Sequence, residues 1–180
     1  AGAGWVDPDA LHLSVTAFGK DFLIDSGKFW YMRDKWTDFA HSSRAHNVIL
    51  IDGCEQEAKP KKVEIPLPEN HWGITEKLDY ARGTHSRFKG LLGEASHTRT
   101  VVFLRNTGWV VIDRITTDLE KGTDEKRNAS ESLRARRVTP LWRFRPERMV
   151  EITSDDVLIT ADEEGANLAI TPVGQIDWRV

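Results

Sequence analysis

The stretch "RTVVFLRNTGWVVIDRI" at residues 99–115 indicates the fold most directly. It contains two runs rich in β-branched and aromatic residues, Arg99–Leu104 and Trp109–Ile115, separated by residues 105–108. Runs of this composition favour β-strands, and a four-residue connection that ends in glycine suits a hairpin. The stretch therefore predicts two antiparallel strands joined by a short turn.

Apolar and polar residues also alternate along much of the remaining chain. In "LHLSVTAF" at residues 11–18, the odd-numbered residues from Leu11 are apolar and the even-numbered residues from His12 to Thr16 are polar. "HNVILIDG" at residues 46–53 has the composition of another strand, which ends at a turn pair of aspartate and glycine. Further short strands are predicted at 63–65, 72–81, 141–145, 149–153, 156–161, 167–171 and 176–179.

Glycine and proline interrupt the chain at strand-like intervals, and no segment carries a helical stripe longer than two turns. This pattern favours an all-β fold, an antiparallel β-sandwich of many short strands, over alternating strands and helices. A chain of 180 residues fits one domain, residues 1–180. Residues 118–137 are rich in charge, so we expect a flexible, solvated loop there, with a short helix as an option for its second half.

The composition narrows the class of protein. With 39% hydrophobic and 29% charged residues, it is typical of a soluble globular domain. The net charge of -3 gives no general reason to expect a nucleic acid, although a local group of arginines and lysines could bind an acidic polysaccharide. The one cysteine, Cys54, excludes an intrachain disulfide and a cysteine-based zinc site. No stretch is long and apolar enough to span a membrane.

Three carboxylate and imidazole residues form the first candidate site. Asp9 lies just before the strand predicted at 11–18, and Asp25 is at the end of the next predicted strand, 22–25. If these strands form a hairpin, Asp25 returns to the neighbourhood of Asp9, and His46 begins the strand that follows. Two carboxylates and an imidazole suit a zinc, calcium or manganese ion. The alternative is that the aspartates only form turns at strand ends, as they do in many β proteins.

Aromatic and cationic residues form further candidates. "KFWYMRDKW" at residues 28–36 crowds Trp30, Tyr31 and other aromatics beside lysine and arginine, so it could stack on sugar rings and hold acidic groups. Packing of these aromatics in the core is an equally good interpretation. His85 belongs to a second cationic string, where a hydrogen-bonded structural role is the commoner one. Arg143 alternates with aromatic residues in "LWRFRPE".

Five segments together resemble the C-terminal β-sandwich domain of the heparinase II/III-like family of polysaccharide lyases. They are "DALHLSVTAFGKDFLIDSGKFWY", "SSRAHNVILIDGCEQ", "YARGTHSRF", "HTRTVVFLRNTGWVVIDRI" and "LWRFRPE", in the family's order. The resemblance implies an N-terminal α-helical toroid elsewhere in a longer protein, a periplasmic or secreted location, and β-elimination on an acidic polysaccharide such as heparin, heparan sulfate or alginate. We therefore expect this chain to be inactive in isolation.

The resemblance also implies roles for single residues. Asp9, Asp25 and His46 match metal-binding positions, with zinc the first choice and calcium the second. Tyr31 is the nearest match to a tyrosine that acts as acid and base, although Phe29 could occupy that position instead. For binding the polysaccharide, the candidates are Arg44, His85, Arg143 and Trp30.

Two departures from the family pattern affect the expected activity. The family usually opens this domain with His-x-His-x-Asp, where this chain has Trp5, Asp7 and Asp9. It often has Leu-Trp-His-Phe near the end, where Arg143 replaces the histidine here. Asp7 thus takes the place of a catalytic histidine, and an aspartate is a weak base at neutral pH unless it is desolvated. Two alternatives follow: a non-catalytic carbohydrate-binding domain that has lost its catalytic histidines, or a structural sandwich with neither ligand.

Overall fold

The structure is a computed structural model that describes residues 7–26, 35–58, 68–117, 135–174 and 177–179. Strands dominate these residues, with one α-helix and two short 3-10 helices among them. The elements in chain order are β1 (Val15–Ala17), β2 (Lys20–Leu23), α1 (Lys35–Ala40), η1 (Ser43–Ala45), β3 (Ile49–Ile51), η2 (Glu69–His71), β4 (Trp72–Ile74), β5 (Leu78–His85), β6 (Ala95–Leu104), β7 (Gly108–Thr117), β8 (Val138–Pro140), β9 (Val150–Ile152), β10 (Leu158–Thr160) and β11 (Ala169–Ile170).

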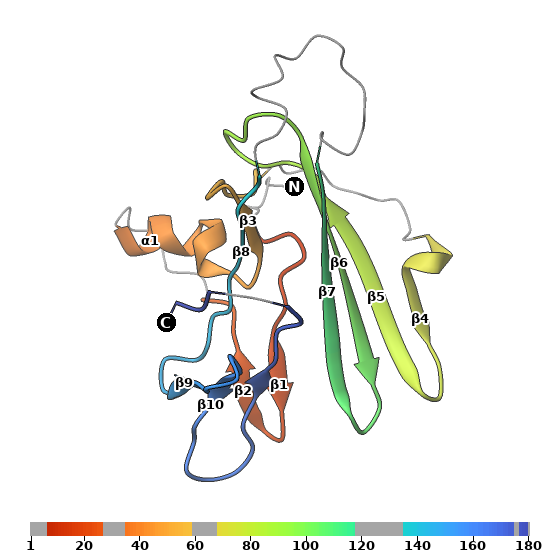
Figure 1. Ribbon diagram of the computed structural model, residues 1–180, viewed down its shortest axis with the longest axis vertical. Helices are drawn as coiled ribbons and strands as arrows, with labels where there is room; N and C mark the ends of the chain where they lie inside the picture. The colour runs from red at the N-terminus through yellow and green to blue at the C-terminus, as the bar shows by residue number, and fades with distance from the viewer. Residues whose placement is uncertain (1–6, 27–34, 59–67, 118–134, 175–176, 180) are drawn as a thin grey trace, which may run out of the picture.

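The strands form four antiparallel sheets. The largest has the order β4-β5-β6-β7, and the smaller ones pair β1 with β2, β3 with β8, and β10 with both β9 and β11. Figure 1 shows the four-stranded sheet on one side of the molecule, with the smaller sheets beside it and α1 on the side away from the large sheet. This arrangement confirms the predicted all-β sandwich, built from antiparallel strands.

The apolar core lies where β3 meets the end of the large sheet. Ile49 and Ile51 of β3 are buried with Ala95 of β6, and partly buried Phe88 and Ile115 pack against them. Burying a large aliphatic side chain stabilises a fold by about 1.5–3 kcal/mol. The packing therefore fixes β3, and the residues just before it, against β6 and β7.

A buried ionic network lies on the same face of β6 and β7. His97 and Arg99 of β6 are 0% and 2% exposed, and Arg99 stands directly opposite Asp113 of β7 in the strand register. Arg99 donates hydrogen bonds to both carboxylate oxygens of Asp113, from Nε at 2.7 Å and from Nη2 at 3.0 Å, and His97 Nε2 lies 2.6 Å from the first oxygen. The inward positions of β6 are thus held by a paired charge as well as by apolar packing.

The hairpin predicted from residues 99–115 is confirmed as β6 and β7, which are longer than expected. Asn106 in the connection has φ +60°, a left-handed conformation that asparagine tolerates better than most residues. The strands predicted at 149–153, 156–161 and 167–171 are confirmed as β9, β10 and β11, each shorter than predicted.

The single strand predicted over 72–81 is wrong, because the chain makes the β4–β5 hairpin there. Thr75 makes this turn: its hydroxyl accepts hydrogen bonds from the amides of Lys77 and Leu78. A turn built on a threonine side chain carries no glycine or proline in the sequence to mark it. Such a turn could therefore not be located from the positions of glycine and proline.

The strand predicted at 141–145 is displaced, because regular pairing ends with β8 at Pro140. Beyond it the chain crosses from β3 to β2: Leu141 N donates to Val48 O, and Arg145 N donates to Phe22 O. Residues 177–179 form no strand, and the predicted strand at 63–65 lies outside the described residues, as does most of the charged segment 118–137. No helix in the described part of the chain is long and apolar enough to cross a membrane.

We expect Asp113→Asn to lower the free energy of unfolding by about 3 kcal/mol, because it leaves the buried Arg99 charge without its counter-ion. Urea denaturation measures the change. The matched control is Asp79→Asn, which breaks a more exposed pair with Arg105 on the same sheet and should lower this free energy by less than about 1 kcal/mol. Equal losses in the two variants would contradict the special role of the buried pair.

The same carboxylate should make the fold sensitive to acid. Burial alone would raise the pKa of Asp113, but hydrogen bonds from His97 and Arg99 outweigh burial and lower it. The stabilisation is therefore complete above the ordinary pKa of an aspartate, about 4, and is lost as the pH falls through the lower folded-state value. In unfolding curves at a series of pH values, wild type and Asp113→Asn should converge below about pH 4. A constant difference between them would show that Asp113 does not titrate in this way.

Candidate functional site

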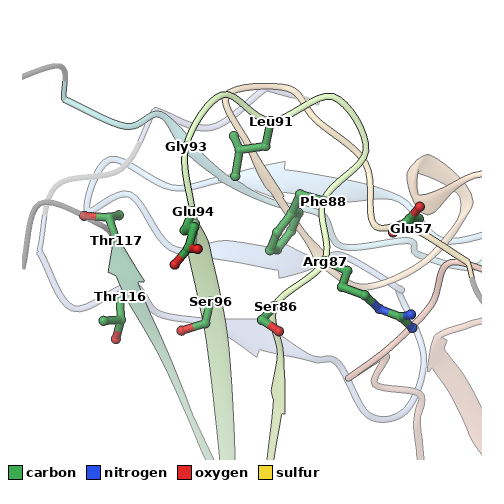
Figure 2. A pocket seen from close by; sticks show the side chains of 11 residues that line it. Glu57, Ser86, Arg87, Phe88, Leu91, Gly93, Glu94, Ser96, Thr116 and Thr117 are labelled. Carbon is green, nitrogen blue, oxygen red and sulfur yellow. The ribbon is translucent and has the colours of Figure 1, made fainter. Parts of the chain in front are cut away.

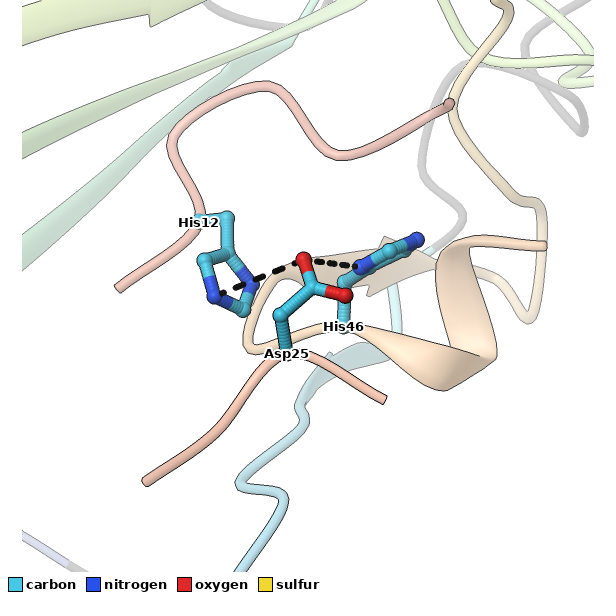
Figure 3. A group of neighbouring side chains, drawn as sticks. All are labelled: His12, Asp25 and His46. Carbon is cyan, nitrogen blue, oxygen red and sulfur yellow. Dashed lines mark hydrogen bonds and ion pairs between the residues drawn. The ribbon is translucent and has the colours of Figure 1, made fainter. Parts of the chain in front are cut away.

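One carboxylate and two imidazole side chains meet beside the hairpin of β1 and β2. Asp25 Oδ2 lies 3.1 Å from His46 Nδ1 and 3.9 Å from His12 Nε2. Figure 3 shows the Asp25 carboxylate between the two imidazole rings, which pack edge to face with their centres 5.7 Å apart. His46 is 1% exposed, whereas the side chain of Asp25 is 44% exposed. The carboxylate is therefore the more exposed of these two members of the trio, which consists of His12, Asp25 and His46.

The hairpin register explains how His12 and Asp25 meet. Val15 of β1 pairs with Leu23 of β2, so the residues that precede β1 lie opposite those that follow β2. Leu11 has φ +67°, which ends the extended conformation just before His12. The predicted strand at 11–18 is therefore shortened to β1, and the imidazole of His12 turns toward the carboxylate.

Asn47 joins the segments that carry the trio. Its side chain is fully buried and donates hydrogen bonds from Nδ2 to Leu13 O at 2.7 Å and to Ile24 O at 3.0 Å. Its Oδ1 accepts a hydrogen bond from the amide of Arg143, and its own amide donates to His12 Nδ1 at 3.0 Å. These partners are His12 itself and neighbours of His12 and Asp25, while Asn47 follows His46 directly. One side chain thus fixes the backbone around all three residues.

Arg99 connects this arrangement to the large sheet. Its Nη1 donates to Leu11 O and to Asn47 O, both at 2.8 Å, while its other nitrogens hold Asp113. The guanidinium also lies over the ring of Trp142, 5.5 Å from the ring centre. The trio is therefore attached to β6 and β7 through a charged group with full hydrogen bonding.

The hydrogen bond from Asn47 determines the protonation of His12. Burial lowers the pKa of His12, and this outweighs the opposing effect of the Asp25 charge, so the ring is neutral at neutral pH. Because Nδ1 accepts the amide proton of Asn47, the single ring proton must be on Nε2. Nε2 then donates to Ser14 Oγ, 2.9 Å away, and faces Asp25.

His46 carries its ring proton on the other nitrogen. Nδ1 faces the Asp25 carboxylate, which accepts a hydrogen bond from it, so the neutral form of the ring has its lone pair on Nε2. His46 Nε2 is buried and has no hydrogen-bond partner among the residues that the structure describes. In Figure 3 this nitrogen points away from His12 and Asp25. An uncompensated buried acceptor of this kind is rare in folded proteins.

These protonation states bear on whether the trio suits a metal ion. The donor atoms lie within 4.8 Å of one another, which is close enough for a shared cation. However, a ligand nitrogen must offer its lone pair, and both nitrogens that face Asp25 carry protons here. His46 could shift its proton, but His12 could coordinate through Nε2 only by losing the hydrogen bond from Asn47. As it stands, the trio is a carboxylate between two imidazole donors and does not fit a three-ligand metal centre.

Asp7 and Asp9 occupy different positions beside the trio. Asp7 Oδ1 lies 2.6 Å from Nδ1 of His41, a histidine that follows α1 and that was not among the predicted residues. The Asp9 carboxylate does not belong to the trio, although its charge opposes the lowering of the pKa of His12. The expected coming together of Asp25 and His46 is thus found with His12 as the third member, and Asp9 as a metal ligand stays a prediction.

The predicted substrate-binding residues have different hydrogen-bond partners in the structure. Arg44 in η1 is half exposed and pairs with Glu55, Nε to Oε1 at 3.0 Å. Arg143 lies next to Asn47, as described above. His85, at the end of β5, faces Arg87 O with Nε2 and packs edge to face on Phe88; its part in binding a polysaccharide stays a prediction.

The remaining predicted residues, Trp30 and Tyr31, lie outside the described residues, as does the alternative Phe29. Trp36, from the same aromatic stretch, is in α1 and is 58% exposed, with Lys35 Nζ 5.2 Å from its ring centre. This tryptophan is therefore available at the surface and is not part of the core.

A cavity of about 420 Å³ lies where β5 ends, β6 begins and β7 ends. Its lining includes Phe88 and Leu91 together with the acidic residues Glu57 and Glu94. Figure 2 shows the guanidinium of Arg87 pointing away from the other lining side chains. No member of the trio lines this cavity, so the two places are separate.

The sequence held a signal for one of the two histidines that were missed. His12 is on the polar face of its predicted strand, and the hairpin register that returns Asp25 places it opposite residues 12–14 instead of Asp9. His41 had no comparable signal, because its contact with Asp7 depends on how α1 is placed. The sequence pattern can predict which residues meet within one hairpin, whereas contacts between distant elements depend on tertiary packing.

Comparison with protein families matches residues 6–178 to the family described as "Heparinase II/III-like, C-terminal". The match covers nearly the whole chain, including the trio, Asp7 and Arg143. Searches of curated proteins and of solved structures gave no significant match.

We expect His12 to occur as the tautomer protonated at Nε2 at neutral pH, because the Asn47 amide occupies Nδ1. Long-range proton–nitrogen correlation spectra of the histidine rings distinguish the two tautomers. His46 should show the opposite tautomer and serves as the internal reference. Protonation of His12 at Nδ1, either in metal-free protein or after addition of zinc, would contradict this arrangement and restore His12 as a metal ligand.

Proposed function

The chain belongs to the heparinase II/III-like family, and we propose that it is the sandwich domain of a polysaccharide lyase that cleaves a uronate-containing glycan by β-elimination. The observation that carries the proposal is the family match over residues 6–178. Heparin, heparan sulfate and alginate are the substrate types that the resemblance suggests. An α-helical domain elsewhere in a longer protein, and a periplasmic or secreted location, belong to the same proposal.

β-Elimination requires three kinds of group. One removes the proton at C5 of the uronate, a second stabilises the negative charge that develops at its carboxylate, and a third protonates the departing glycosidic oxygen. Tyr31 is our candidate for proton transfer to and from the sugar. The last described residues before it in the chain are Asp25, a member of the trio, and Ser26, whose Oγ donates to Ala45 O.

The pair of Asp7 and His41 is our second candidate for proton transfer. Relatives use a histidine at position 7, and the carboxylate that replaces it here holds the Nδ1 of another histidine at 2.6 Å. A carboxylate in this position orients an imidazole and stabilises its charged form, as in other acid and base pairs. We assign the basic role to His41 and the orienting role to Asp7.

A divalent metal ion, zinc before calcium, stays a prediction that rests on the resemblance. Asp25 and His46 are the residues of the trio whose donors could serve it, because the protonation of His12 opposes coordination. The proposed reaction steps do not depend on that ion.

The second candidate function is a non-catalytic carbohydrate-binding domain. The observation that favours it is the replacement of two expected histidines, at Asp7 and Arg143. Salt-sensitive binding of an acidic glycan without turnover would support this alternative.

We expect the full-length protein to release unsaturated oligosaccharides from a uronate polymer, because elimination leaves a double bond conjugated with the carboxylate. Ultraviolet absorbance against a panel of heparin, heparan sulfate and alginate detects these products. The complete absence of such products from every polymer in the panel would exclude the lyase and favour the binding domain.

Tyr31→Phe and His41→Gln should each lower kcat at least about a hundredfold, the usual contribution of one proton-transfer group. His71→Gln is the control, because His71 is in η2 beside β4, the edge strand of the large sheet. Unchanged kcat in both test variants would remove these residues from the mechanism.

A further inference from the structure

Arg143 is a cation without a counter-ion among the described residues. Its side chain is half-buried, and its Nε is shielded from solvent without a hydrogen-bond partner. None of the ion pairs found in the described part of the chain includes it, whereas Arg145 pairs with Asp21 and Glu147. Burying an unpaired charge is unfavourable, and such a group in a native fold calls for an explanation.

The surroundings of Arg143 increase this cost. Burial lowers the pKa of Arg143, and the positive charge of Arg44 lowers it further. The carboxylate that could compensate, Glu55, is engaged by Arg44 Nε at 3.0 Å and by the Ser43 amide at 3.2 Å. Two guanidinium groups thus share a region in which the available carboxylate is already in use.

The position of Arg143 is fixed by its backbone and by an aromatic ring. Its amide donates to Asn47 Oδ1, and its carbonyl accepts a hydrogen bond from Ile24 N at 2.9 Å. The guanidinium carbon lies 5.7 Å from the ring centre of Phe39 in α1, a favourable cation–π distance. The backbone of Arg143 is thus bonded to Ile24 and Asn47, which are next in the chain to Asp25 and His46, and its charge is held beside Phe39.

We propose that Arg143, with Arg44 beside it, binds an oxyanion group, a carboxylate or a sulfate, of the acidic glycan. An anion at this place would neutralise the repulsion between the two arginines and accept hydrogen bonds from the terminal nitrogens of Arg143. Arginine presents a planar fork of donors that matches both kinds of group. That the anion belongs to a glycan rests on the proposed function, whereas the anion site itself rests on the geometry of Arg143.

The direct test compares binding of the full-length protein and its Arg143→Gln variant to heparin, which carries sulfate and carboxylate, to alginate, which carries carboxylate alone, and to neutral dextran. Affinity for at least one anionic polymer should fall about tenfold or more, the effect of losing charge-assisted hydrogen bonds. Loss on heparin alone would identify sulfate as the bound group, and loss on both would identify the carboxylate. Arg145→Gln is the matched control and should bind like wild type.

A second measurement separates binding from structure. Arg143→Gln should unfold at the same or a higher urea concentration than wild type when no glycan is present, because it removes an unpaired charge. Lower stability of the variant, or unchanged affinity for both anionic polymers, would overturn the proposal. If the protein binds the anionic polymers through Arg143 but forms no unsaturated product, the anion site stands and the lyase function is rejected. If it forms the product but Arg143→Gln binds the polymers as well as wild type does, the lyase function stands and the anion site is rejected.

Discussion

The ion pair of Arg99 and Asp113 is the constraint on which the rest of the structure depends. Arg99 is buried and Asp113 partly buried on the face of β6 and β7 that packs toward β3, and the remaining nitrogen of Arg99 bonds to two carbonyls from the opposite layer. Those carbonyls belong to Leu11 and Asn47, which flank two members of the trio. A charged group in this place is acceptable only because every nitrogen is used, since a buried guanidinium with a missing partner is strongly destabilising.

Hydrogen bonds connect Arg99 to the trio and determine the protonation of His12. Asn47 is placed by Arg99, and its amide in turn assigns the ring proton of His12. Asp25 then faces imidazole nitrogens of His12 and His46, and its side chain is 44% exposed. Arg143 differs from these groups, because its backbone is fully engaged while its charge has no partner among the described residues. The contrast between satisfied and unsatisfied polar groups separates the residues that build the site from the one proposed to bind a ligand.

The fold was largely accessible from local pattern, and the site only in part. Alternation and turn residues located β6, β7 and the last three strands, since a half-buried strand imposes that period on its sequence. The β4–β5 turn escaped because the Thr75 side chain makes it. Asp25 and His46 were predicted to meet and do, but the third member is His12 where Asp9 was expected. The family pattern pointed to positions 9, 25 and 46, whereas the hairpin register and the Leu11 conformation decided which side chain faces Asp25.

The reach of Arg99 along the chain has a consequence for the order of folding. Its bonds join residue 99 to residues 11 and 47, so each closes a long loop before the contact is made. Loop closure of this length is entropically unfavourable and slow compared with the formation of a local hairpin such as β6–β7. The hairpin can therefore form early, but the trio assembles only when the first quarter of the chain docks onto it. A nascent chain that ends between His46 and β6 carries all three trio residues but lacks the arginine that holds the segments around them.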